Sequence, residues 1–486
     1  MGAGNGTTPE PAGGGHAEHG RAWRWVRVAA LGVVLLVAFA VVPAAVLAVS
    51  SVGFDRSRYA PPPPSGPAPA STVGAARPPH DPRKPTAVVL VGNHGANVAD
   101  ALVPFDILAT TGAFNVYTVA PERRPVPLLG GLDLVPDLSL AELSAMLGGA
   151  APDVTVVPEM PDTDPGTGAD DAPVTAWLRD VAGEGLVLGV CTGARLVAEA
   201  GLVDGRPATS HWYRLAGLEE NHPAVRWQRG LRYVDDGDVV TTGGLLSSVD
   251  GTLRVVERLA GPAAAAAAAA DVGWRHYSPA APATLPANAV TPTNGAVHVL
   301  NLGFRSGTTT IGILLAGGVG ELELASAFDP YAEGKVARTL SLAADPRGVR
   351  SRHGLTFVPR AGLDAVGGID RLLVPGPGGG AEVTAALTAA GSVGIPAARL
   401  HAQTGFAFDG ALQDMARATD APTAQWTAKI LEYPAEDFRV TGRSWPWGPT
   451  LGALALGLTG LAVALAATVL VRRRRAAPAQ RGRTRG

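Results

Sequence analysis

Residues 185–212 read GLVLGVCTGARLVAEAGLVDGRPATSHW and hold Cys191, the only cysteine of the chain. The apolar run 185–190 predicts a short buried strand, and the apolar spacing over 192–202 predicts a helix. Cys191 is therefore expected at a sharp strand-to-helix turn, with a glycine two residues away on either side. This is the pattern of a nucleophile elbow, in which glycine leaves room for the turn that lifts the central side chain out of the sheet.

The predicted helix would present free N–H groups and the positive end of its dipole to the sulfur of Cys191. We therefore expect its thiol to titrate below the ordinary value of about 8.5, as in a nucleophile or an oxidation sensor. His211 follows twenty positions later, and a returning strand over 208–210 would bring its imidazole to the sulfur as a base or ion-pair partner. The alternative is a buried cysteine that packs as a small hydrophobe.

Three short motifs in this stretch point to one family. They are Cys-Thr-Gly-Ala at 191–194, Ala-Glu-Ala-Gly-Leu at 198–202 and Ala-Thr-Ser-His-Trp at 208–212. They resemble the ThiJ/PfpI family of the class I glutamine amidotransferase-like superfamily, and most closely isocyanide hydratases and the amidase-like domains of AraC-type regulators. The resemblance covers about residues 85–275. It implies an α/β fold of the flavodoxin-like kind, a parallel sheet with helices on both faces.

The resemblance also implies which residues form the site. The family has a carboxylate five residues after a loop glycine, and the same count from Gly95 gives Asp100 as a third catalytic group. An aspartate in the first turn of a helix is equally explained as a complement to the helix dipole. Gly189 and Gly193 would shape the elbow, and the amide of Thr192 would serve as an oxyanion donor. We expect no metal and no other cofactor.

One departure from the family pattern concerns the oxyanion site. Relatives usually have Pro-Gly-Gly after the third strand, whereas this chain has Pro-Glu-Met-Pro at 158–161. Glu159 thus stands where a developing negative charge would need hydrogen-bond donors. Thr192 also replaces the histidine that follows the nucleophile in the peptidase-like branch, which disfavours proteolysis.

Composition narrows the class of partner. The formal net charge is −2, which argues against a large nucleic-acid-binding surface, and the sequence has no recognisable helix-turn-helix. We therefore expect a small-molecule ligand or substrate and no nucleic acid. A single cysteine excludes an internal disulfide, so the cysteine count does not identify the compartment.

Two uncharged apolar stretches predict membrane helices. Residues 28–52 follow three arginines and are long enough to cross a bilayer of about 30 Å; the alternative is a signal peptide cleaved after 46–48. Residues 449–471 run directly into the arginines at 472–475, a stop-transfer pattern. A buried core helix is the simpler alternative for each. Because arginines precede the first stretch and follow the second, we expect both termini in the cytoplasm and the middle of the chain outside the plasma membrane.

A second region parallels the first without its cysteine. Residues 309–330 parallel 87–106, and 404–406 parallel 242–244. The intervening segment is much shorter in the second region, so the elbow, its helix and the histidine strand are predicted to be missing there. Glu323 stands at the position of the first-loop carboxylate, but without a cysteine this region cannot perform the same chemistry. We expect a structural or ligand-holding role.

The predicted organisation is a cytoplasmic tail (1–27), a transmembrane helix (28–52), a Pro-rich linker (53–85), a ThiJ/PfpI-like domain with the cysteine site (86–275), a linker (276–294), a degenerate ThiJ/PfpI-like domain (295–440), a second transmembrane helix (449–471) and a basic cytoplasmic tail (472–486). Two functions remain open. One is hydratase or amidase-type chemistry with Cys191 as nucleophile, His211 as base and Asp100 as proton shuttle. The other is a non-catalytic sensor of a ligand or oxidant. A homodimer is compatible with either.

Overall fold

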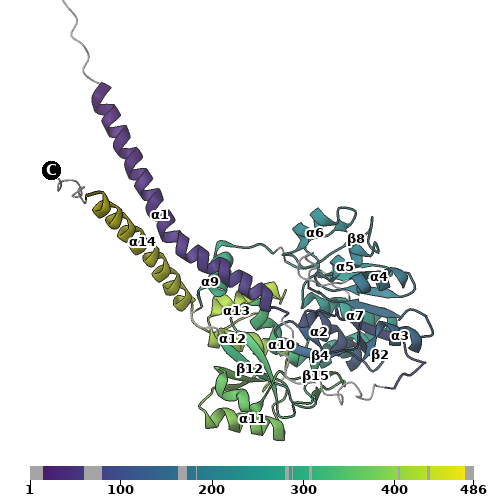
Figure 1. Cartoon of the computed structure of the whole chain (residues 1–486). Helices are drawn as coiled ribbons and strands as arrows, with labels where there is room; N and C mark the ends of the chain where they lie inside the picture. The colour runs from purple at the N-terminus through teal and green to yellow at the C-terminus, as the bar shows by residue number, and fades with distance from the viewer. Residues whose placement is uncertain are drawn as a thin grey trace, which may run out of the picture.

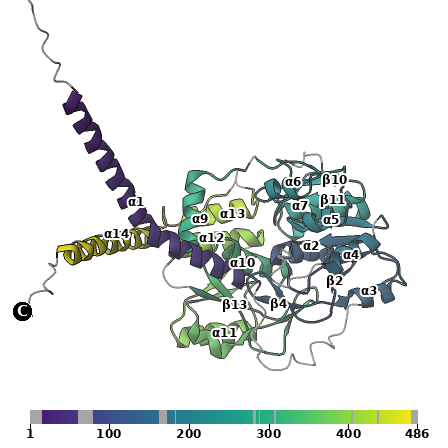
Figure 2. The same ribbon diagram turned by 45° about the horizontal axis from the view of Figure 1, so that its top comes forward.

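Two α/β units lie side by side, and two long helices extend away from them together (Figure 1). The computed structural model describes residues 15–59, 79–161, 172–181, 183–279, 284–286, 288–305, 309–402, 405–434 and 438–476. The proline run at 61–64 and the outer parts of both predicted tails lie outside these residues. Turning the molecule keeps the same arrangement, with the long helices on the side of the second unit (Figure 2).

The first unit is built on a seven-stranded sheet in the order β10-β11-β7-β6-β1-β2-β5. Its strands are β1 (Thr86–Leu90), β2 (Asn115–Ala120), β5 (Leu138–Ser139), β6 (Val154–Val157), β7 (Leu186–Gly189), β10 (Tyr233–Asp236) and β11 (Val239–Thr242). All neighbours are parallel except β10 and β11. The central strands are buried runs of valine and leucine, as expected for a parallel sheet covered on both faces. The predicted α/β fold is therefore present in this unit.

Helices cover this sheet. They are α2 (Val98–Thr110), α3 (Leu140–Met146), α4 (Ala172–Asp180), α5 (Gly193–Glu199), α6 (Leu215–Asn221), α7 (Ser247–Ala260) and α8 (Pro262–Asp271), with a small sheet of β8 (Pro207–Ala208) and β9 (Arg226–Trp227) nearby. Helix α5 lies within the range 192–202 predicted for a helix. The alanine run at 263–270 forms the separate helix α8 rather than an extension of α7, because Gly261 has φ 90° and the proline that follows starts a new helix.

The second unit has a five-stranded parallel sheet in the order β16-β13-β12-β17-β18. Its elements are α9 (Pro292–Phe304), β12 (Thr310–Leu314), α10 (Glu321–Glu333), β13 (Arg338–Ala343), β16 (Ala361–Gly362), the 3₁₀ helix η1 (Leu363–Gly368), β17 (Arg371–Val374), α11 (Ala381–Ser392), β18 (Ala397–Arg399), α12 (Ala407–Ala418) and α13 (Ala421–Ile430). This order matches β5-β2-β1-β6-β7 of the first sheet. The prediction that the elbow strand is missing is wrong, because β18 lies beside β17 as β7 lies beside β6. Among the described residues, no counterpart of α5 or β8 separates β18 from α12.

The two units share a sheet of their own. The hairpin β3 (Val126–Leu128) and β4 (Leu132–Val135) pairs with the hairpin β14 (Val349–Arg350) and β15 (Thr356–Val358) through an antiparallel β4–β15 ladder. Beside this ladder, Arg360 donates two hydrogen bonds of 2.8 Å to the buried carboxylate of Asp133. The units are therefore joined by backbone pairing and by a buried ion pair.

Helices α2 and α10 pack across the same junction, and each has a carboxylate that binds a first-turn amide of the other helix. Asp106 of α2 accepts a hydrogen bond from the Leu322 amide at 2.8 Å, and Asp329 of α10 accepts one from the Ala99 amide at 3.1 Å. Each carboxylate thus meets the amides that a helix leaves unpaired at its N-terminus. Burial, followed by the charge of Glu321, raises the pKa of Asp106 to about 6.

The two long helices are α1 (Gly15–Ser57) and α14 (Trp447–Ala476). By length and composition, their segments Trp25–Ser57 and Trp447–Arg474 could cross a membrane. They pack together where Gly457 lies against Phe39 and Gly460 lies against the Ala38 carbonyl, as small residues permit at helix crossings. Helix α1 is longer than the helix predicted at 28–52. It begins at Gly15, within the predicted tail (1–27), and continues to Ser57, within the predicted linker (53–85).

Candidate functional site

Cys191 occupies the turn between β7 and α5 with an unusual backbone conformation. Its φ is 56°, a region that non-glycine residues rarely adopt and that often marks functional sites. Only 2% of the residue is exposed. A side chain at Gly193 would place its Cβ 2.0 Å from the Val157 carbonyl oxygen, so this position requires glycine. The turn therefore has the close packing expected of an elbow.

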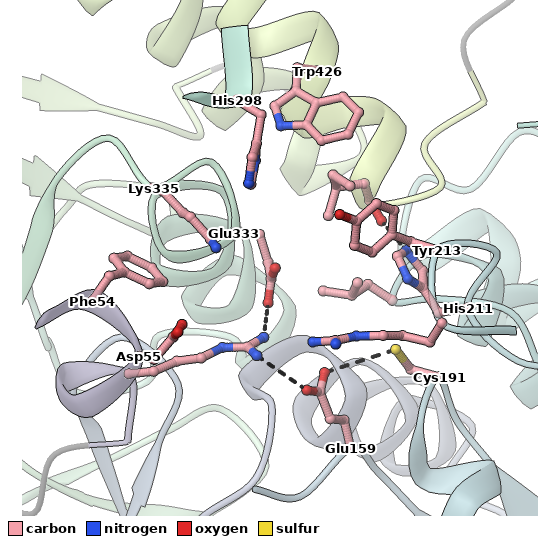
Figure 3. A pocket seen from close by; sticks show the side chains of 14 residues that line it. Phe54, Asp55, Glu159, Cys191, His211, Tyr213, His298, Glu333, Lys335 and Trp426 are labelled. Carbon is pink, nitrogen blue, oxygen red and sulfur yellow. Dashed lines mark hydrogen bonds and ion pairs between the residues drawn. The ribbon is translucent and has the colours of Figure 1, made fainter. Parts of the chain in front are cut away.

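Two carboxyl groups lie beside the sulfur. Glu159 follows β6, and its Oε2 lies 4.0 Å from the Cys191 sulfur (Figure 3). Asp100, in the first turn of α2, accepts a hydrogen bond from the Glu159 amide at 3.2 Å through Oδ2. Its other oxygen, Oδ1, is buried without a hydrogen-bond partner among the described residues. One ligand atom from each of the three residues lies within 4.8 Å of the others. The structure therefore brings Asp100 to the cysteine and adds Glu159.

The expectation of a lowered thiol pKa is wrong for this environment. Burial raises the pKa of the Cys191 thiol well above its ordinary value, and the charges of Asp100, Glu159 and Glu432 raise it further. The Thr192 amide, which donates to the sulfur, opposes this shift. Burial, and then the charge of Glu159, also raises the pKa of Asp100. Both groups therefore favour their protonated forms, because desolvation and neighbouring anions outweigh one short helix terminus.

His211 is held by the second unit rather than by the cysteine. Its Nε2 lies 2.8 Å from the Ile430 carbonyl oxygen. Since a carbonyl can only accept, Nε2 carries the proton, and Nδ1 is the nitrogen left for other chemistry. The ring packs over Gly244, where an added Cβ would lie 2.0 Å from Cδ2. Among the described residues, the sulfur hydrogen-bonds to Glu159 and no hydrogen bond joins it to His211, so the expected Cys191–His211 pair is not formed there.

The side chains of Cys191 and His211 nevertheless line the same cavity, which has a volume of about 100 Å³. Three parts of the chain form its walls. The end of α1 gives Phe54, Asp55 and Arg58; the first unit gives Glu159, Cys191, His211, Tyr213, Arg214 and Leu245; and the second unit gives His298, Glu333, Lys335, Trp426 and Ile430. Figure 3 shows their side chains converging on one space. The site is therefore shared between units that are distant in sequence.

Arg58 links these parts electrostatically. Its guanidinium lies 2.5 Å from a Glu333 oxygen and 3.5 Å from a Glu159 oxygen. The sequence analysis missed Arg58, Glu333 and Lys335, because it assigned Arg58 to a linker and named no ligand-binding residue in the second region. The only available signal was an arginine directly after an apolar helix, a pattern that is common at membrane surfaces.

Residues 85–258 match the DJ-1/PfpI family. This part of the chain belongs to that family. Isonitrile hydratase of Pseudomonas putida is 29% identical over 163 residues, which are 33% of this chain and 67% of that protein. The transcriptional regulator CdhR of Pseudomonas aeruginosa is 37% identical over 87 residues, 18% of this chain and 26% of the regulator. The chain thus spans about a quarter of that regulator's length.

Two solved structures are similar to part of the chain. A ThiJ/PfpI family protein from Pseudomonas syringae is 24% identical, with a TM-score of 0.34, over 42% of this chain and 84% of the other. An AraC family transcriptional regulator from Pseudomonas putida is 20% identical, with a TM-score of 0.33, over 39% and 99% of the respective chains.

The second unit has a histidine where the DJ-1/PfpI domain has its cysteine. Counting along the paired strands places His401 at the position of Cys191 and Gly376 at that of Glu159. The Gly376 amide donates to Nδ1 of His401 at 2.9 Å, and Nε2 lies 3.0 Å from the Ser326 hydroxyl. Nδ1 is therefore an acceptor and Nε2 carries the proton, so this imidazole is not a base for Ser326. Burial also lowers the pKa of His401.

The charge of Glu159 gives a test of the cysteine's environment in the DJ-1/PfpI domain. We predict that Glu159→Gln lowers the Cys191 thiol pKa by about one unit, because it removes a neighbouring anion. Alkylation by iodoacetamide at pH 7 should then be about tenfold faster. Glu122→Gln, a change at an exposed position, serves as the control. An unchanged or slower rate in Glu159→Gln would contradict this account.

Proposed function

We propose that this chain is a membrane-anchored protein that binds a small molecule in the Cys191 cavity. It senses this ligand and does not convert it. The observation that carries the proposal is Glu159 beside the sulfur. A carboxylate there disfavours the thiolate and stands where an acyl-transfer enzyme needs donors for an oxyanion. Relatives named as transcriptional regulators are consistent with a sensing role.

Hydration of an isonitrile is the second candidate, and Asp100 favours it. The sulfur of Cys191 would bond to the isonitrile carbon, protonated Asp100 would give that carbon a proton, and the thiol proton would pass to the Asp100 carboxylate, which leaves a thioimidate on the sulfur. Water, with Nδ1 of His211 as base, would then add to the same carbon. The C–S bond would break, with one water proton ending on the nitrogen and the other on the sulfur, to yield an N-substituted formamide and the free thiol. The first addition develops no oxyanion, so Glu159 would not oppose it as it would amide hydrolysis. A relative named isonitrile hydratase supports this candidate.

The proposal gives the second unit a ligand-holding role. We regard residues 295–440 as a degenerate copy of the 86–275 domain, on the basis of the matching strand order. Glu333 and Lys335 line the cavity, and the Ile430 carbonyl orients His211. The second copy would thus contribute walls and orientation in place of a nucleophile.

Ligand binding and turnover can be separated in the full chain purified in detergent. We predict that cyclohexyl isonitrile or its hydration product, N-cyclohexylformamide, raises the melting temperature without conversion of the isonitrile. Cys191→Ser should keep this stabilisation, because the cavity remains, and Lys335→Met should weaken it. Conversion that Cys191→Ser abolishes would favour the hydratase. If neither compound stabilises the protein and none is converted, both assignments of the ligand are wrong.

For the membrane arrangement, we propose that α1 and α14 cross the membrane, with both termini in the cytoplasm and both α/β units outside. The arginines that follow the apolar part of α14 support this orientation. Protease added to intact spheroplasts should digest the central units and spare a tag placed after Gly486. Loss of the tag from intact spheroplasts would contradict the proposed orientation.

A further inference from the structure

The turn that follows α1 lies against the Cys191 cavity. Arg58 and Tyr59 form this turn, and Phe54, one helical turn earlier, lies 4.9 Å beneath the ammonium of Lys335. These contacts connect the predicted membrane helix to both units at the point where they enclose the cysteine. The end of α1 is thus part of the site and not a free tether.

Arg58 forms an ion pair with each of the two α/β units. Its ion pairs reach Glu159 of the first unit and Glu333 of the second, and only 19% of its side chain is exposed. A buried cation needs such partners, because removing it from water is costly. Both partners also line the cavity. A molecule that reaches the sulfur beside Glu159 must therefore share or displace the contacts of Arg58.

Tyr59 carries a polar group with no partner. Its hydroxyl is buried and has no hydrogen bond among the described residues, while the guanidinium of Arg58 lies 5.6 Å from its ring centre. Burial, and then the charge of Glu159, raises the pKa of Tyr59 well above its ordinary value. An unsatisfied buried hydroxyl is unfavourable to folding. Its position beside the cluster of carboxylates therefore points to a ligand that completes its hydrogen bonding.

We propose that the end of α1 is a movable wall of the ligand site, with Arg58 as its latch and Tyr59 as a ligand contact. The proposal rests on the Cys191 cavity being the ligand site, as argued above. The ligand class is a small neutral molecule with a hydrogen-bonding acceptor, because Arg58, Glu159 and Glu333 already pair with one another. Since α1 continues as one helix from this turn, occupancy would bias the position of the helix through differential affinity for two states.

The latch can be tested without knowing the ligand. In the detergent-solubilised full chain, the rate of Cys191 alkylation by iodoacetamide is measured against pH. The plateau of this profile reports access to the thiolate, and its midpoint reports the thiol pKa. We expect Arg58→Ala to raise the plateau about tenfold while the midpoint moves upward, because a cation near the thiolate is lost. The exposed neighbour provides the control Arg56→Ala, which should change neither quantity. A plateau unchanged in Arg58→Ala would overturn the latch.

Tyr59→Phe tests the ligand contact. Removing an unpaired hydroxyl should leave the melting temperature of the free protein unchanged or higher, and should weaken binding of N-cyclohexylformamide about tenfold. A lower melting temperature would mean that the hydroxyl is structural and would overturn this role, as would unchanged affinity. If the wild type binds no such probe, the proposed ligand fails, and the alkylation plateau alone still decides whether the end of α1 covers Cys191.

Discussion

The guanidinium of Arg58 is the point where the three parts of this chain meet. It pairs with Glu333 at 2.5 Å and with Glu159 at 3.5 Å, and Glu159 in turn lies 4.0 Å from the sulfur of Cys191. Without this cation, two carboxylates would remain unpaired in a largely buried space, which is strongly unfavourable. The geometry around the cysteine therefore depends on a residue supplied by the end of a predicted membrane helix.

This arrangement requires the two α/β units to be fixed relative to each other. The β4–β15 ladder and the exchange of carboxylates between α2 and α10 provide that fixation. Further along the interface, the Ile430 carbonyl binds His211 and the Leu246 amide donates to the Leu431 carbonyl at 3.0 Å. The second unit thus sets the orientation of a side chain in the first. The absence of a cysteine from the second unit does not make that unit dispensable to the site.

The sequence allowed prediction of the local parts of this structure. The family resemblance predicted the α/β fold, and the glycines around Cys191 predicted a turn whose tight packing is visible at Gly193. The family count placed Asp100 near the sulfur, where it lies. These features can be predicted because they depend on residues that are close together in the sequence. The raised pKa of Cys191 could not be predicted in the same way, because burial and carboxylates from distant segments cause it. Arg58 and Lys335 were missed for the same reason, since only long-range packing brings them to the cavity.

The central claim is that the end of α1 and the second unit meet beside Cys191. Chemical cross-linking in membranes tests it most directly, because Cys191→Ser removes the only native cysteine. In that background, Arg58→Cys and Glu333→Cys should be joined by a short bismaleimide within one chain, whereas the exposed position in Arg56→Cys should react far less with Glu333→Cys. Mass spectrometry distinguishes this product from a cross-linked dimer. An absence of intrachain cross-linking between positions 58 and 333, with both thiols reactive, would contradict the account.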